Sequence, residues 1–198
     1  MKEKTFITIT RQYGSGGLYI AEALAKKMNA KCYNRNIVAA AAESLDNVDD
    51  IKTVIDNAYD TPNDFLSSIS SLIGQGVPRQ NQMYIQQARI IRELAEGEES
   101  AVFVGRCADY ILRDVPNHFS FFLYADDECR RKRAQEYYKD FSFEDVLDVD
   151  KKRKSYYAYY TGRTWGDPQN YDLMINTTNI TAEQAVKIIL DYVELRQQ

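Results

Sequence analysis

The stretch that decides the fold is Arg11-Gln12-Tyr13-Gly14-Ser15-Gly16-Gly17. It follows the apolar run 6–9 and precedes an amphipathic pattern whose apolar positions are Ile20, Leu24 and Met28. A glycine-rich turn between a strand and a helix exposes backbone N–H groups at the positive end of the helix dipole, where phosphate binds. The stretch therefore predicts a phosphate-binding loop.

This loop departs from the consensus G-x-x-x-x-G-K-[ST] at three positions. Arg11 stands in place of the first Gly, Gly17 in place of the Lys, and Leu18 in place of the Mg²⁺-binding Ser or Thr. Because Arg11 directly follows the predicted strand, it could supply part of the missing positive charge. A surface ion pair with an acid such as Glu3 explains it equally well. The function therefore depends on whether the loop is a working variant.

Composition limits the class of protein. The chain has 198 residues, of which 44% are hydrophobic and 27% charged, and these values are typical of one soluble globular domain. The net charge of −4 argues against general binding of nucleic acid polymers. No apolar run is long enough for a signal peptide or a membrane span, so we expect a cytoplasmic protein without a membrane partner.

Cysteine and histidine are too sparse for a metal centre. Cys32, Cys107 and Cys129 are isolated, which favours buried thiols over a disulfide or a metal site. The single histidine, His118, makes a histidine-based metal site or catalytic triad improbable. We expect His118 in a turn before a strand.

Strand and helix patterns alternate along the chain, which predicts an α/β fold with a parallel sheet. The Asp-rich stretch 46–76 indicates an inserted helical element, and Thr181 with Gln184 resembles a helix capping box. Predicted strands cover 6–9, 31–33, 101–104, 119–124 and 171–175, and predicted helices begin near Gly17, Arg35, Gln80, Asp126, Phe143 and Thr181.

Basic residues gather in the third quarter of the chain. A solvated helix face is the commoner explanation of such a run, and a clamp for polyphosphate is the alternative. The residues are Arg130, Arg131, Lys132, Arg133, Lys151, Lys152, Arg153, Lys154 and Arg163.

Four stretches in a fixed order carry a family resemblance. They are the loop 14–17 with the helix start 20–25, the strand end Val104-Gly105-Arg106, the pair Asp150 and Arg153, and the tail 156–168 with Tyr171-Asp172-Leu173. Together they resemble the nucleoside monophosphate kinases and, within them, the cytidylate kinase-like family. The resemblance covers nearly the whole chain and is weakest over 46–78.

The resemblance implies a P-loop kinase fold, in which helices flank a central parallel sheet. It implies a single domain over 1–198, with a monophosphate-binding insert within 34–98 and a helical lid within 126–170. Two departures concern the acceptor side. True cytidylate kinases have an Asp where this chain has Cys107, and an Arg-Asp pair where it has Val146-Leu147.

Arginines are the candidate catalytic residues, because phosphoryl transfer depends mostly on alignment and on neutralising charge. Arg106 follows a buried strand, at the edge where α/β proteins bind ligands. The resemblance implies that Arg106 binds the phosphate of the acceptor. For each of the candidate arginines, salt bridging to nearby acids is the structural alternative. The set is Arg106, Arg130, Arg131, Arg133 and Arg153.

Two further sets are candidate binding residues. Asp109 could orient Arg106 or hold Mg²⁺ through water, and an acid that favours a helix N-terminus is an equal alternative. Asp150 and Arg153 form an ordinary intrahelical ion pair or bind the acceptor. The ATP-binding set is Arg11, Tyr13, Gly14, Ser15, Gly16, Gly17 and Leu18, and the acceptor-binding set is Arg35, Arg106, Asp109, Asp150, Arg153 and Arg163.

The leading hypothesis is a kinase that transfers a phosphoryl group from ATP, with Mg²⁺, to a nucleoside monophosphate or a similar small acceptor. Nucleotides are then its partners, and a homo-oligomer is compatible with the sequence. The alternative is a non-catalytic nucleotide-binding or regulatory protein with a degenerate loop. A third hypothesis is a kinase of a non-nucleotide substrate selected by residues 46–78.

Overall fold

The computed structural model describes residues 4–34, 37, 39–40, 79–97, 99–137 and 142–198. The predicted helix from Arg35 is therefore described only in part, and the insert at 46–78 lies outside the described residues.

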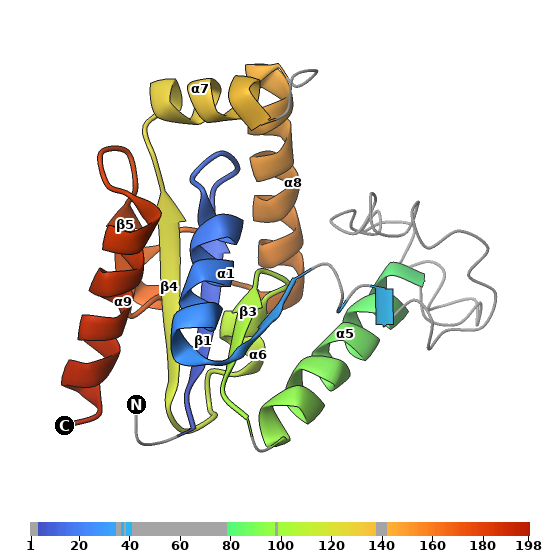
Figure 1. Cartoon of the computed structure of the whole chain (residues 1–198). Coiled ribbons are helices and arrows are strands. Elements are labelled where there is room, and N and C mark those ends of the chain that lie inside the picture. The colour runs from blue at the N-terminus through green and yellow to red at the C-terminus, as the bar shows by residue number, and fades with distance from the viewer. Residues whose placement is uncertain (1–3, 35–36, 38, 41–78, 98, 138–141) are drawn as a thin grey trace, which may run out of the picture.

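Five parallel strands form the sheet, which confirms the predicted fold class. Their order is β2-β3-β1-β4-β5, so that the loop-bearing strand β1 lies at the centre (Figure 1). β1 pairs with β3 on one side and β4 on the other, and Ile9 lies opposite both Val104 and Phe121. The strands are β1 (Phe6–Arg11), β2 (Lys31–Tyr33), β3 (Ala101–Val104), β4 (His118–Tyr124) and β5 (Leu173–Asn176).

Helices cover both faces of the sheet, because successive strand side chains point to opposite sides. Ile7 and Ile9 pack with α1 (Gly17–Met28) and α9 (Ala182–Arg196). Phe6 and Phe103 pack in a second core with α5 (Arg79–Glu96), α6 (Ala108–Ile111) and α8 (Phe143–Thr161). The full burial of Ile9 and Phe103 shows that each core is closed.

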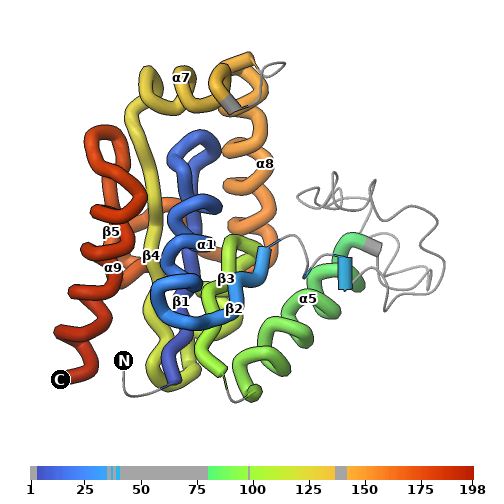
Figure 2. The backbone as a smooth tube through the Cα atoms, in the orientation of Figure 1, coloured from blue at the N-terminus to red at the C-terminus, as the bar shows by residue number. Residues whose placement is uncertain are grey.

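The carboxyl end of the sheet carries the remaining elements. α7 (Asp127–Tyr137) follows β4, crosses above the strand ends and leads to α8, which returns beside the sheet (Figure 2). A short 3₁₀ helix, η1 (Pro168–Asn170), links α8 to β5. The loop after β1 thus lies beneath two helices that come from a later part of the chain.

Three sequence expectations are corrected. β1 extends to Arg11, because Thr10 and Arg11 still pair with Phe122 and Leu123 of β4. His118 is not in a turn but opens β4 opposite Phe6. The last strand begins at Leu173 rather than at residue 171, because η1 continues to Asn170.

Within the described residues, no helix combines the length and the apolar character needed to span a membrane.

Candidate functional site

The loop after β1 has the backbone of an anion site. Gly14 and Gly16 both have φ of 77°, a left-handed conformation that glycine adopts without strain. Gly16 is the N-cap of α1, and the first helical hydrogen bond runs from the Ile20 N–H to the Gly16 carbonyl at 3.0 Å. Among the described residues, no hydrogen bond uses the N–H groups of Gly14, Gly16 or Gly17. These N–H groups are therefore available to a ligand.

The loop carbonyls, in contrast, are all occupied by the protein. The side chains of Arg153, Arg130 and Arg133 donate to the carbonyls of residues 11, 13 and 14, at 3.0, 2.8 and 3.5 Å. The Ser15 hydroxyl donates to the Gln12 carbonyl at 2.8 Å, and the Thr177 hydroxyl donates to the Ser15 carbonyl at 2.8 Å. With its acceptors held on the protein side, the loop offers donors, as anion binding requires.

Arg130 is the centre of a buried ion-pair network. Only 2% of it is exposed, and its guanidinium also donates to the carboxylates of Asp127 and Asp150. The second oxygen of Asp150 accepts the Tyr13 N–H at 2.8 Å and lies 3.5 Å from an Arg153 nitrogen. Because Arg130 belongs to α7 while Asp150 and Arg153 belong to α8, this network fixes both helices to the loop.

A second turn follows β3 and has a strained backbone. Gly105, Arg106 and Cys107 have φ of 72°, 62° and 55°. A side-chain-bearing residue in the left-handed region costs about 1–2 kcal/mol, and such strain is characteristic of functional positions. The Gly105 N–H donates to the Ile9 carbonyl at 3.0 Å, which ties this turn to β1. Arg106, at the centre of this strained turn, is buried.

Asp109 lies in α6, directly after this turn, and is buried. Burial raises the pKa of its carboxyl group, and hydrogen bonds from the Tyr157 hydroxyl at 2.6 Å and the Thr10 hydroxyl at 3.4 Å oppose the increase. Asp109 therefore joins α6 to α8 and β1 and does not line the pocket described next. Thr10 was not a sequence candidate, although its alternation with Phe6 and Thr8 places it on this face.

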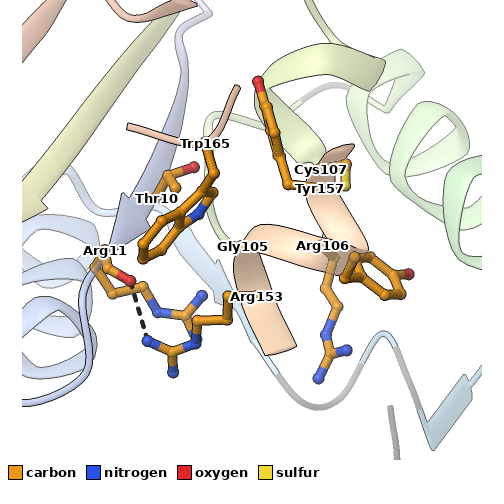
Figure 3. A pocket seen from close by; sticks show the side chains of 9 residues that line it. Thr10, Arg11, Gly105, Arg106, Cys107, Arg153, Tyr157 and Trp165 are labelled. Atoms are coloured by element: carbon orange, nitrogen blue, oxygen red, sulfur yellow. Dashed lines mark hydrogen bonds between the residues drawn. The ribbon is translucent and has the colours of Figure 1, made fainter. Parts of the chain in front are cut away.

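A pocket lies between the two turns, α8 and the segment that carries Trp165. It is small and open to solvent. Among the described residues that line it, three are arginines and none is acidic, which gives the pocket a positive charge. Figure 3 shows the side chains of Arg11 and Arg153 pointing toward each other, while Arg106 lies apart from them. The lining residues are Thr10, Arg11, Gly105, Arg106, Cys107, Arg153, Tyr156, Tyr157 and Trp165.

The structure separates the other sequence candidates from this pocket. Arg131 is exposed, with its guanidinium 4.2 Å from the centre of the Phe143 ring, and Arg163 is exposed over the Tyr110 ring at 5.1 Å. Arg35 lies outside the described residues. Of the arginines proposed from sequence, Arg106 and Arg153 line the pocket, while Arg130 and Arg133 contact the loop.

The residues present do not fit the usual magnesium site of such a loop. Leu18, at the Ser or Thr position, has no oxygen to offer and is 42% exposed. Ser15 is fully buried, and its hydroxyl donates to the Gln12 carbonyl. The described residues contain no group of three or more His, Cys, Asp or Glu side chains placed to hold a metal ion.

The sheet order and the phosphate-type loop at the end of its central strand define a P-loop kinase fold. The chain matches the cytidylate kinase-like family model over residues 6–179. It belongs to that family, which confirms the resemblance seen in the sequence. Family and fold support a phosphotransferase and leave the acceptor open.

Solved structures share this fold. An uncharacterized protein from Eubacterium ventriosum is 26% identical, with a TM-score of 0.71, over 96% of this chain and 99% of that one. A shikimate kinase from Bacteroides thetaiotaomicron is 13% identical (TM-score 0.56; 96% and 98% covered). A gluconokinase from Sinorhizobium meliloti is 14% identical (TM-score 0.57; 96% and 91% covered). No match is found among curated proteins.

Proposed function

We propose that this protein transfers the γ-phosphoryl group of ATP to a small acceptor that carries an anionic group, with a nucleoside monophosphate as the leading candidate. One observation carries the proposal. A loop whose carbonyls are all held by the protein, and whose glycine N–H groups are available, adjoins a pocket lined by three arginines and no described acid. Two anion-binding elements side by side suit a donor phosphate and an acceptor phosphate.

The residues have separate roles in this proposal. The N–H groups of Gly14, Gly16 and Gly17 bind the phosphates of ATP, which supplies the phosphoryl group. Arg106 and Arg153 neutralise charge in the pocket and orient the acceptor, because planar guanidinium groups bind phosphate oxygens in pairs. Arg130 and Arg133 act as positioning residues, since their donors hold the loop carbonyls. The proposed catalytic gain thus comes from alignment and charge neutralisation.

Magnesium has no oxygen ligand at the loop position that usually holds it, because that position is Leu18. This same observation favours a second candidate function, which is nucleotide binding without turnover. The two candidates differ in a measurable way. A kinase releases ADP in the presence of an acceptor, whereas a binding protein only retains the nucleotide.

The test is an ADP-release screen against a panel of nucleoside monophosphates and small phosphorylated or carboxylated alcohols, with and without Mg²⁺. We expect turnover with at least one acceptor and a loss of about 100-fold for R106A. The matched control is R89A, because Arg89 is an exposed arginine whose ion pair with Glu93 lies on the surface of α5. ATP binding without ADP release for any acceptor would establish the second candidate instead.

A further inference from the structure

Gly17 and Arg11 compete for the same space. A Cβ atom built on Gly17 would lie 2.7 Å from both the Cβ and the Cγ of Arg11. Non-bonded carbon atoms do not approach so closely, since their optimal separation is about 3.5–4.0 Å. The Arg11 Cβ is fixed by the backbone of β1 and cannot rotate away. A side chain at position 17 and the present side chain at position 11 therefore exclude each other.

These are the two positions where the loop departs from its consensus in charge. The consensus has glycine at the position of Arg11 and lysine at the position of Gly17. Here the charged side chain is at the end of the strand and the glycine at the start of the helix. The steric exclusion makes the two departures a single exchange, because the lysine could not be present while the arginine is.

The exchange places the positive charge at the end of β1 instead of at the start of α1. Arg11 is the last residue of β1 and lines the pocket that Arg106 and Arg153 also line. Its carbonyl accepts a hydrogen bond from Arg153 at 3.0 Å, and the two side chains point toward each other in Figure 3. The Arg11 guanidinium is thus placed where the loop after β1 meets the pocket.

We propose that Arg11 replaces the loop lysine, and that it contacts the phosphoryl group at the junction of the donor loop and the acceptor pocket. The proposal rests on the proposed function for the identity of that group. The steric exchange and the binding of a polyphosphate anion can be tested without turnover.

The first test is a stability cycle at the two positions. Gly17 does not have a positive φ, so alanine suits its backbone and has the better helix propensity. We expect G17A to lower the melting temperature by about 5 °C in the wild type, where Arg11 fills the space. In the R11G background the same change should raise the melting temperature by about 2 °C. An equal effect of G17A in both backgrounds would overturn the exchange.

The second test is the binding of inorganic tripolyphosphate, followed by calorimetry. We expect R11G to weaken binding about tenfold, because one charge-assisted contact is lost. R11G/G17K should restore affinity to within about threefold of the wild type. R11A/G17K should not, because the alanine keeps the Cβ that lies 2.7 Å from the position-17 Cβ. Wild-type affinity in R11G would contradict the proposal.

ADP release separates this inference from the proposed function. With an acceptor that the wild type phosphorylates, R11G should reduce turnover about 100-fold. The double variant R11G/G17K should reach at least about a tenth of the wild-type turnover. If the wild type releases no ADP, the proposed function fails, while the stability cycle and the tripolyphosphate affinities still decide whether Arg11 has taken the place of the lysine.

Discussion

Two neighbouring turns at the carboxyl end of the sheet use opposite designs. The loop after β1 has its positive φ values at glycines and presents backbone N–H groups. The turn after β3 places Arg106 and Cys107, which both carry side chains, at positive φ and presents a guanidinium. A hydrogen bond from the Gly105 N–H to the Ile9 carbonyl ties the turn after β3 to β1, the strand that carries the other loop.

This difference shows where each turn derives its stability. The loop after β1 is locally unstrained but depends on distant side chains, since Arg130 and Asp150 hold its backbone. The turn after β3 is locally strained and is followed by the buried Asp109, which accepts hydrogen bonds from the Tyr157 and Thr10 hydroxyls. Loss of the Arg130–Asp150 ion pair should therefore affect the first turn, and loss of the hydrogen bonds to Asp109 should affect the second.

The largest effect is expected for D150N. The substitution removes the carboxylate that faces Arg130 and Arg153 and leaves buried guanidinium charge poorly compensated. The free energy of unfolding, measured by urea denaturation, should fall by about 4 kcal/mol. The control D191N removes a carboxylate from an exposed pair with Lys187 and should cost less than about 1 kcal/mol. Similar losses for the two variants would show that the network does not stabilise the loop.

A smaller loss is expected for G14A. A Cβ on Gly14 would lie 3.0 Å from the Arg130 carbonyl oxygen, and the residue would also be held at positive φ. We expect a loss of about 3 kcal/mol from the sum of backbone strain and overpacking. G162A is the matched control, because Gly162 has φ of 69° and a Cβ there meets nothing within 4 Å. It should lose only about 1 kcal/mol, and equal losses would remove the contact with α7 from the explanation.

The smallest effect is expected for Y157F, which tests the turn after β3. Without the hydroxyl, the buried Asp109 carboxylate loses its 2.6 Å hydrogen bond, and the unfolding free energy should fall by about 2 kcal/mol at neutral pH. That hydrogen bond lowers the pKa of Asp109 against the effect of burial. The deficit of the variant should therefore shrink as the pH falls and Asp109 takes up a proton.

Y159F is the control for this variant. Tyr159 is half-buried on the same helix, and its hydroxyl makes no hydrogen bond to another described residue. Its loss should be within about 0.5 kcal/mol. A deficit of Y157F that does not change with pH would separate Tyr157 from the titration of Asp109.

The parts of the fold that depend on local pattern were predictable from the sequence. The strand Ala101–Val104 is a continuous apolar run, and the structure has the same bounds. Thr181 and Gln184 form the expected capping box, with reciprocal hydrogen bonds of 3.2 and 2.8 Å. Each of these signals lies within a few residues, so no knowledge of distant partners was needed.

Which arginines contact the loop and which are exposed was not predictable from the sequence. Arg130 and Arg131 are adjacent on α7, yet the first is buried on the loop and the second is exposed. Helical geometry turns neighbours about 100° apart, but which of them meets the loop depends on how α7 docks. Thr177 likewise gave no signal, because its contact with Ser15 spans 162 residues.

The distant supports of the loop after β1 have a consequence for its synthesis on the ribosome. The Tyr13 N–H meets Asp150, which is synthesised 137 residues later. The Ser15 carbonyl waits longer still, for Thr177. The nascent chain therefore forms local helices before the loop is complete, because the loop reaches its final shape only after both Asp150 and Thr177 have been synthesised.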